Sequence, residues 1–351
     1  MDEAPGTPEP PTTDAPPARP KTSWWRWTLA ALIVGGFAFA AFVVPLPIYY
    51  SEGPGPVRDV GKLVDVSGAE TYSSEGVLYL TTVSIDDQVT VAEIVQSIFD
   101  PTLKLISEEQ FTGGRPYEEI LEQAREDMSL SKQHAQEVAL TALGLGHPEG
   151  DGARVSETLE GAPADGVVEP GDVIVEVDGQ EVQTTCDVGR LIDLHDVDDE
   201  VDLVVERDGE RVPLELKTTS LPENENQPLI GIVMDDINYR FVSDVEVAFE
   251  TDRIGGPSAG LMFSLALYDR LTPDDLTEGL TIAGTGVISC DGGISPIGGV
   301  EQKVAAAEDN DASVFLSPSA NYQAAVAVAG DGIEVVSIAT FADALDYLEG
   351  L

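Results

Sequence analysis

The stretch GGPSAGLMFSLALYDRL (Gly255–Leu271) does most to decide the fold. Two glycines and a proline lead into an apolar run typical of a buried helix, and VEVAFE (Val245–Glu250) before them alternates as a strand does. This order places Ser258 at the start of a helix, where free N–H groups and the positive end of the helix dipole can hold an oxyanion. Two interpretations remain open. The serine is a nucleophile, or it only caps the helix, which is the simpler choice on this segment alone.

A nucleophilic serine needs a base, and the histidines are poorly placed to supply one. All three precede residue 220: His134, His147 and His195. After Lys217 a single lysine remains, Lys303, in PIGGVEQKVAAA (Pro296–Ala307). Burial among Val and Ala would favour its neutral amine, and lowering its pKa to about 7–8 takes roughly 3.5–4.5 kcal/mol. The alternative is a surface lysine on an amphipathic helix.

Three short motifs follow one another in the last third of the chain. They are Gly-Pro-Ser-Ala-Gly at Gly256–Gly260, Thr-Gly at Thr285-Gly286, and Pro-Ile-Gly-Gly-Val-x-x-Lys at Pro296–Lys303. In this order and at this spacing they resemble the proteolytic domain of the Lon protease family, over residues 228–351. The resemblance implies a mixed α/β (α+β) domain that cleaves polypeptides.

The same resemblance implies a role for each matching residue. Ser258 and Lys303 would form a catalytic dyad, with Thr285 placed to contact the lysine. The turn backbone around the serine would shape the oxyanion site: Gly256, Pro257 and Ala259. Asp252 is not among the predicted catalytic residues, because a carboxylate beside the lysine would raise its pKa and oppose its role as a base.

A second unit is indicated between residues 128 and 219, where short strands alternate with tight turns. The stretch EPGDVIVEVDG (Glu169–Gly179) closely resembles bacterial PDZ domains, small β-rich α/β modules that bind peptides by adding a strand to a sheet edge. The loop before it has two open interpretations. It binds a peptide carboxylate through its N–H groups, or it merely ends the preceding helix, predicted over Pro116–Leu143. Its residues are Leu143, Gly144, Leu145 and Gly146.

The front of the chain predicts a membrane anchor. Residues 1–22 have the composition of a disordered tail, and Thr28–Val44 runs seventeen residues without a charge, long enough for a spanning helix. Aromatic residues flank the run on both sides: Trp24, Trp25, Trp27, Tyr49 and Tyr50. Arg19, Lys21 and Arg26 precede the run, whereas acids and bases are mixed after it, so the short tail is predicted in the cytoplasm and the rest outside the cell. A cleavable signal peptide is the alternative, although no small-x-small site follows the run.

These observations divide the chain into five parts: 1–22 tail, 23–50 transmembrane anchor, 51–127 exported segment, 128–219 PDZ domain and 220–351 Lon-type domain. A strand is predicted over Gly76–Ile85, and we expect it to pack on the Lon-type domain. The order of parts resembles the membrane-anchored PDZ–Lon proteins of bacteria. No G-x-x-x-x-G-K-[ST] phosphate loop occurs, so this chain holds no ATPase module of that kind. The resemblance suggests a homo-oligomer, and neither a cofactor nor a metal is expected.

The charge excludes one class of partner. Acidic residues number 64 against 18 basic ones, a net charge of -46, which argues against nucleic acid because phosphate binding needs a basic surface. Residues 1–50 hold four acids and three bases, which leaves 60 acids and 15 bases to the exported part. The negative field of the exported part would raise the pKa of Lys303 and favour its protonated form, so local burial must outweigh this field. Activity is therefore predicted to rise with pH and with added salt. The two cysteines, Cys186 and Cys290, lie 104 positions apart, a spacing that predicts neither a disulfide framework nor a zinc site.

The predicted function is therefore that of a membrane-anchored serine endopeptidase whose PDZ domain assists substrate binding. Two alternatives from other classes remain. One is a catalytically idle, membrane-anchored peptide-binding scaffold. The other is an acyl transferase or esterase, because a Ser–Lys dyad serves any acyl transfer.

Overall fold

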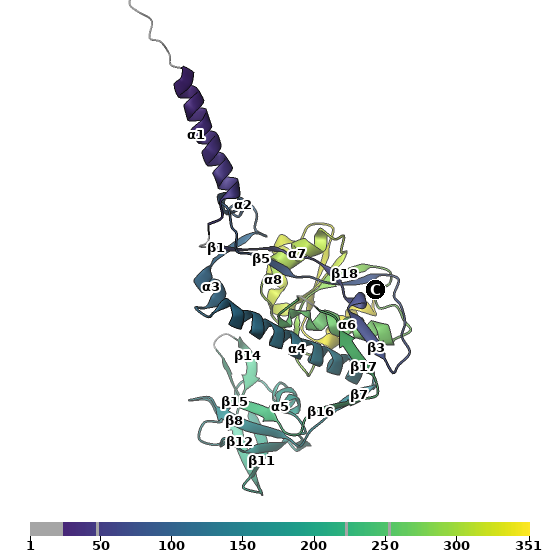
Figure 1. Cartoon of the computed structure of the whole chain (residues 1–351). Coiled ribbons are helices and arrows are strands. Elements are labelled where there is room, and N and C mark those ends of the chain that lie inside the picture. Colours follow the sequence, from purple (N-terminus) through teal and green to yellow (C-terminus); the bar gives the residue numbers. More distant parts are fainter. Residues whose placement is uncertain (1–23, 47–48, 222–223, 252–253) are drawn as a thin grey trace, which may run out of the picture.

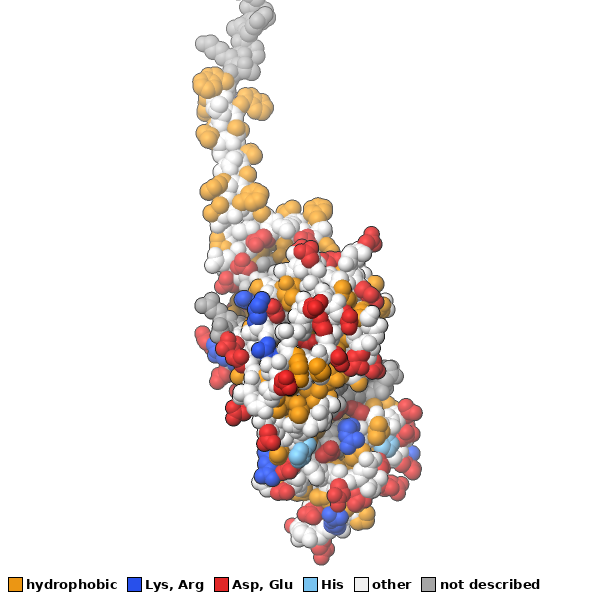
Figure 2. Space-filling view, turned by 90° about the vertical axis from the view of Figure 1, so that its right-hand side faces the viewer, with side chains coloured by type: hydrophobic (Ala, Val, Ile, Leu, Met, Phe, Trp, Pro, Cys, Tyr) orange, Lys and Arg blue, Asp and Glu red, His pale blue; other side chains and the backbone are white. Residues whose placement is uncertain are grey.

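The structure is a computed structural model that describes residues 24–46, 49–221, 224–251 and 254–351. Helix α1 (Trp24–Val43) stands away from the folded body, and none of its residues is buried (Figure 1). It is long and apolar enough to cross a membrane, a property that a signal sequence shares. The predicted disordered tail, residues 1–22, lies outside the described residues. Acidic side chains cover much of the face that Figure 2 shows, as the net charge leads one to expect.

A small sheet connects α1 to the body. Strand β1 (Tyr49–Pro54) lies between β5 (Val83–Asp86) and β6 (Lys104–Ser107), antiparallel to both. Two short helices belong to this part, α2 (Val91–Gln96) and α3 (Glu108–Thr112), and both begin with a capping box.

The main sheet joins segments from both ends of the chain. Its order is β2-β4-β18-β21-β22, with β2 antiparallel and the other strands parallel. The strands are β2 (Arg58–Asp59), β4 (Val77–Leu80), β18 (Thr281–Gly284), β21 (Val314–Pro318) and β22 (Glu334–Ile338). The prediction of one strand over Gly76–Ile85 is wrong, since the chain leaves this sheet after Leu80 and enters the small sheet as β5. A run of β-branched residues favours extended backbone but carries no information about which sheet each half joins.

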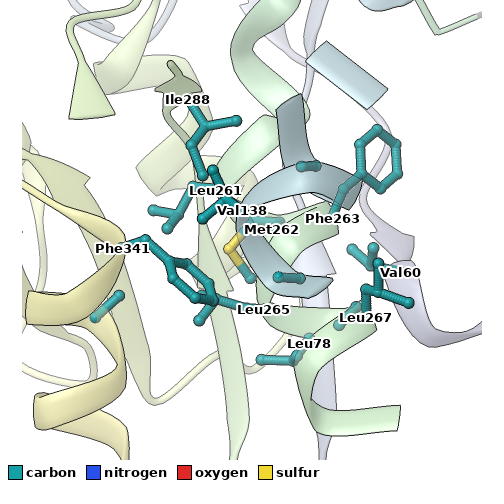
Figure 3. Close-up of a cluster of buried hydrophobic side chains, with 14 of the residues drawn as sticks. Val60, Leu78, Val138, Leu261, Met262, Phe263, Leu265, Leu267, Ile288 and Phe341 are labelled. Carbon is teal, nitrogen blue, oxygen red and sulfur yellow. The ribbon is translucent and has the colours of Figure 1, made fainter. Parts of the chain in front are cut away.

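Helices cover both faces of the main sheet. On one face lie α6 (Gly260–Leu271), α9 (Phe341–Leu348) and the long α4 (Tyr117–Ala142), which matches the helix predicted over Pro116–Leu143. Residues Leu261–Leu267 of α6 are all buried, and its side chains form the centre of the core in Figure 3. On the other face lie α7 (Val300–Glu308) and α8 (Tyr322–Val328). Parallel strands covered on both sides are mostly apolar, and β21 is buried along its whole length, with Ser317 as its one polar residue.

The PDZ region forms a separate sheet with its own core. The strand order is β12-β11-β9-β8-β15, and β10 pairs with β9. The elements are β8 (Ala153–Thr158), β9 (Val173–Val177), β10 (Gln180–Glu181), α5 (Thr185–Ile192), β11 (Glu200–Arg207), β12 (Glu210–Lys217) and β15 (Ile232–Asp236). Strand β15 follows residue 219, the predicted end of the domain, yet pairs inside this sheet. The predicted hairpin turn at Asp178-Gly179 is confirmed, with φ values of 49° and 75°.

Four short strand pairs complete the described structure. They are β3 (Val64–Ser67) with β17 (Glu246–Phe249), β7 (Gly146–Glu149) with β16 (Arg240–Ser243), β13 (Thr219–Leu221) with β14 (Asn224–Leu229), and β19 (Val287–Ile288) with β20 (Ile294–Ser295). The β7–β16 pair carries the chain from α4 into the PDZ region and back (Figure 1). The PDZ region is thus inserted between β4 and β18, which are partners in one sheet.

A disulfide joins the two parts. Cys186 at the start of α5 is bonded to Cys290 after β19, with Cα atoms 6.1 Å apart. The expectation that the two cysteines would not form a disulfide is therefore wrong. Their 104-residue separation says nothing of distance in space, because the fold brings α5 of the PDZ region against a turn of the C-terminal part.

Candidate active site

Ser258 lies in a short 3-10 turn, Pro257–Ala259, that leads into α6. The preceding Gly256 has φ 87°, a left-handed conformation that favours glycine. Helix α4 fixes this turn from outside: the Gly256 N–H donates to Ala124 O at 2.7 Å, and the Ser131 hydroxyl donates to Pro257 O at 2.9 Å. The turn is therefore held by α4, a helix that precedes the strands of the PDZ sheet in sequence.

Lys303 projects from α7 toward this turn and is only 4% exposed. Its Nζ lies 2.9 Å from Ser258 Oγ and 3.0 Å from Thr285 Oγ1. Burial lowers the pKa of Lys303 from its ordinary value of 10.5 to about 8. At that value a useful fraction of the amine is neutral near pH 8, with a lone pair available to accept a proton.

The hydrogen bonds of Thr285 restrict which way that lone pair can point. The fully buried Thr285 hydroxyl donates to Ser258 O at 3.1 Å, so its oxygen is left to accept from Lys303 Nζ. With one N–H directed at Thr285, the neutral amine can turn its lone pair toward Ser258 Oγ. The Gly286 N–H also donates to Ser258 O, at 3.0 Å, so two donors fix the serine backbone.

The predicted turn residues differ in what their backbone can offer. Pro257 has no N–H, and the Gly256 N–H is used by Ala124 O. These two residues shape the turn instead of donating to an oxyanion. The N–H groups left in the turn belong to Ser258 and Ala259.

Ser258 and Lys303 line a cavity of about 1070 Å³. Apolar walls come from residues that include Leu63, Leu80, Val83, Met128 and Ile254. Part of the cavity lining comes from β1, β4 and β5, which precede the PDZ region: Glu52, Leu80, Val83, Ser84 and Ile85. The cavity is therefore built jointly by the exported segment and the C-terminal part.

The predicted peptide-binding loop takes the geometry of a helix end. Gly144 is left-handed with φ 67°, and the N–H groups of Leu143, Gly144 and Leu145 donate to the last carbonyls of α4. Gly146 begins β7 and pairs with Ser243 of β16. This arrangement favours the second of the two interpretations, a helix terminus, because three of the four N–H groups are already used.

Other candidate groups lie elsewhere. None of the three histidines contacts Ser258. Instead, His134 contacts Ile288 O, His147 contacts Glu149 and His195 contacts Asp178. Asp252 lies outside the described residues. Within the described ranges no group of three or more His, Cys, Asp or Glu side chains could hold a metal ion.

Comparison with known proteins finds the same two kinds of domain, although the PDZ match begins within α4, which packs in the main core, and ends before β15. A model of the PDZ domain matches residues 129–218, and a model of the Lon protease (S16) C-terminal proteolytic domain matches residues 245–346. The chain combines a PDZ domain with a Lon-type proteolytic domain. The candidate dyad falls inside the Lon-type match.

Curated relatives match over stretches of 82 to 96 residues. The chain is 37% identical to Lon protease 2 of Bacillus subtilis over 95 residues, 27% of this chain and 17% of that protein. It is 33% identical to the Lon protease of Campylobacter jejuni over 96 residues, 26% of this chain and 12% of the relative. A probable periplasmic serine endoprotease, DegP-like, of Bartonella henselae is 30% identical over 82 residues, 23% of this chain and 16% of that protein. The chain thus spans less than a fifth of these relatives.

Among solved structures, the PDZ domain of the SdrC-like protein from Listeria innocua is 28% identical, with a TM-score of 0.23. The match covers 24% of this chain and 93% of that one.

Two parts of the Lon-type site were not predicted from the sequence. Ala124 and Ser131 of α4 hold the turn that carries Ser258, yet they lie more than a hundred residues before it. Neither residue belongs to a motif, because an alanine carbonyl or a helical serine can play such a part at almost any position. The second part is the cavity lining at Thr81–Ile85: we expected Gly76–Ile85 to pack on the Lon-type domain, but nothing in its sequence indicated a place beside Ser258.

Proposed function

We propose that this chain is a membrane-anchored serine endopeptidase that cleaves polypeptides with a dyad of Ser258 and Lys303. The observation that carries the proposal is the 2.9 Å contact between Ser258 Oγ and the Nζ of a lysine that is 4% exposed. The Lon-type match over residues 245–346 supports a serine peptidase domain.

The chemistry follows from the contacts. Neutral Lys303 accepts the proton of Ser258 Oγ as the oxygen attacks the scissile carbonyl and forms an Oγ–C bond. N–H groups of the turn stabilise the oxyanion. The tetrahedral intermediate collapses, the C–N bond breaks, and the Lys303 ammonium returns its proton to the leaving amine. A water, deprotonated by the same amine, then hydrolyses the acyl-serine ester and regenerates Ser258.

Thr285 acts as a positioning residue in this scheme. Its oxygen accepts one N–H of Lys303, and its own proton is committed to Ser258 O. The amine therefore cannot turn its lone pair toward Thr285 without losing a hydrogen bond inside a buried site, and Ser258 Oγ is the other hydroxyl that it contacts.

The anchor and the PDZ domain complete the proposal. Helix α1 has 20 residues, about 30 Å at 1.5 Å per residue, which equals the thickness of a bilayer core. With its basic residues before α1, the chain would leave its tail in the cytoplasm and expose the protease outside. The PDZ domain would hold polypeptide substrates near the cavity, and several copies would assemble as a homo-oligomer.

The test of the dyad is direct. Ser258→Ala and Lys303→Ala should each abolish cleavage of casein by the purified full-length chain, while Lys62→Ala should not. Lys62 is the matched control because its side chain is exposed and lies on the surface beside Asp59. Labelling of Ser258 by a fluorophosphonate would distinguish an enzyme from an idle scaffold. Hydrolysis of esters without cleavage of peptides would favour an esterase. Activity retained in either dyad variant contradicts the mechanism.

A further inference from the structure

An apolar stripe lies exposed on α2 and the turn that follows it. Val91, Val95, Ile98 and Phe99 are 39%, 51%, 72% and 82% exposed. Their spacing is i, i+4, i+7 and i+8, which places them on one face of a helix. The backbone bonds from Ile98 N to Val95 O and from Phe99 N to Gln96 O continue the helical turn past the end of α2. We call these four residues the α2 stripe.

Hydrogen bonds fix the segment that carries the α2 stripe at both of its ends. The Thr90 hydroxyl accepts from Glu93 N, and the Glu93 carboxylate accepts from Thr90 N at 2.7 Å, so the helix start is capped from both sides. At the other end, the Asp100 carboxylate accepts from both the backbone N–H and the hydroxyl of Thr102, which fixes the turn that follows Phe99. Large apolar side chains on a mobile tail would need no explanation. On a capped helix they form a defined surface.

The stripe lies beside the end of α1. Helix α1 ends at Val43, and three residues later the Leu46 N–H donates to Val89 O at 2.8 Å. Pro45 forms an isolated bridge with Thr90, the cap of α2. These bonds hold the start of α2 at the base of α1, as Figure 1 shows, and Figure 2 shows hydrophobic side chains at the top of the folded body there.

The length of α1 sets where this base lies relative to a bilayer. Its 20 residues span about 30 Å, the whole hydrocarbon core, so Val43 would lie at the outer boundary of the core. A segment bonded to residues 45 and 46 then lies in the headgroup region. Interfacial helices bury their apolar face about 5–10 Å into this same zone.

We propose that the α2 stripe is a second membrane contact, which inserts into the outer interface of the bilayer that α1 crosses. This inference rests on the anchoring part of the proposed function and is independent of the dyad. The stripe would hold the small β1–β5–β6 sheet against the lipid. Because β5 lines the catalytic cavity, the contact would fix the cavity at a set height above the membrane.

Charges around the stripe predict which lipid it favours. Asp86 and Asp87 are exposed before α2, and hydrogen bonds from Thr102 hold the pKa of Asp100 below its usual range. These carboxylates repel an anionic surface, so insertion should be driven by apolar contact alone and be deeper in zwitterionic vesicles than in anionic ones.

An environment-sensitive probe can test the contact in the full-length chain. Both native cysteines are consumed by the Cys186–Cys290 disulfide, so one added cysteine can be labelled with an NBD maleimide. The variants are F99C and I98C, with L194C as the matched control. Leu194 is 72% exposed, as Ile98 is, but lies in the PDZ region far along the chain from α1. Each labelled chain is reconstituted into phosphatidylcholine vesicles, with and without spin-labelled lipid.

The expected result is emission at shorter wavelength and quenching by spin-labelled lipid at positions 98 and 99, with neither effect at 194. Emission at 98 and 99 equal to that at 194 overturns the proposal. A shift to shorter wavelength without lipid quenching also overturns it, since the stripe then contacts protein, such as a second copy. Flotation of the same samples tests anchoring by α1, and casein cleavage tests the dyad, so each failure is distinguishable.

Discussion

Replacing Lys303 by methionine should stabilise the protein while abolishing its activity. Lys303 is 4% exposed, and burial lowers its pKa from 10.5 to about 8. At pH 7 the lysine is protonated in both the folded and unfolded chain, and keeping that charge buried costs about 3 kcal/mol at 1.36 kcal/mol per pKa unit. Methionine has a similar length and no charge, so this cost disappears in the variant.

Two losses reduce the gain. The variant leaves Ser258 Oγ and Thr285 Oγ1 without the donor Nζ, at a cost of about 0.5–1.5 kcal/mol for each hydrogen bond. Thr285 and Ser258 keep their other bonds, so we expect the net gain at pH 7 to lie between zero and about 2 kcal/mol.

The pH dependence of the stability difference between K303M and wild type tests the lowered pKa more directly than the net gain at pH 7. Between pH 8 and pH 10.5 the unfolded chain still binds a proton at residue 303 while the folded chain does not, so wild-type stability rises with pH there. The cost of burial therefore falls from about 3 kcal/mol at pH 7 to about 1 kcal/mol at pH 10. The advantage of K303M over wild type should shrink by about 2 kcal/mol over that range.

Urea unfolding of both proteins at pH 7, 8, 9 and 10 measures this difference, and groups that titrate alike in both cancel. K62M is the control, because Lys62 is an exposed lysine paired with Asp59, and its replacement should give no gain at any pH. A difference between K303M and wild type that does not change from pH 7 to pH 10 would refute a lowered Lys303 pKa.

Three further predictions follow from the same contacts. The kcat/KM for cleavage of a peptide should rise about tenfold from pH 7 to pH 9, because the neutral fraction of Lys303 grows through a pKa of about 8. A kcat/KM that does not change over this pH range contradicts this. The increase of activity with added salt stays a prediction. T285V, which removes the hydroxyl between Lys303 and Ser258, should lower kcat about 10- to 100-fold, as roughly 1.5–3 kcal/mol is lost with a hydrogen bond to a charged group, while T285S retains most activity. Loss of the disulfide in the double variant C186S/C290S should lower the free energy of unfolding by about 2–4 kcal/mol, and an unchanged urea midpoint would count against that.

Local patterns in the sequence predicted local structure well. The apolar run after Pro257 forms α6, the helical spacing over Pro116–Leu143 forms α4, and Asp178-Gly179 forms the expected hairpin turn. Each of these features is encoded by neighbours within a few residues, which fix backbone geometry through propensity and periodicity.

Contacts between distant segments could not be predicted in this way. Nothing in the spacing of Cys186 and Cys290 indicates that α5 packs against the turn after β19. The support of the serine turn by Ser131 likewise depends on how α4 crosses α6, which is set by tertiary packing. For the site itself, the order of the motifs predicted that Ser258 and Lys303 form a pair, and in the structure Ser258 Oγ lies 2.9 Å from Lys303 Nζ. Their catalytic roles stay predictions.

The insertion of the PDZ region between β4 and β18 also bears on how the protein is made. Val77 pairs with Thr281, so a strand that leaves the ribosome early waits for a partner 204 residues later. At about 5–20 residues per second, that wait lasts roughly 10–40 s. The PDZ region can complete its own sheet during the delay, but the cavity cannot close until nearly the whole chain has emerged. The lining of the cavity is complete only once Lys303 of α7 has emerged, so the proposed protease cannot act on other chains before that point of its own synthesis.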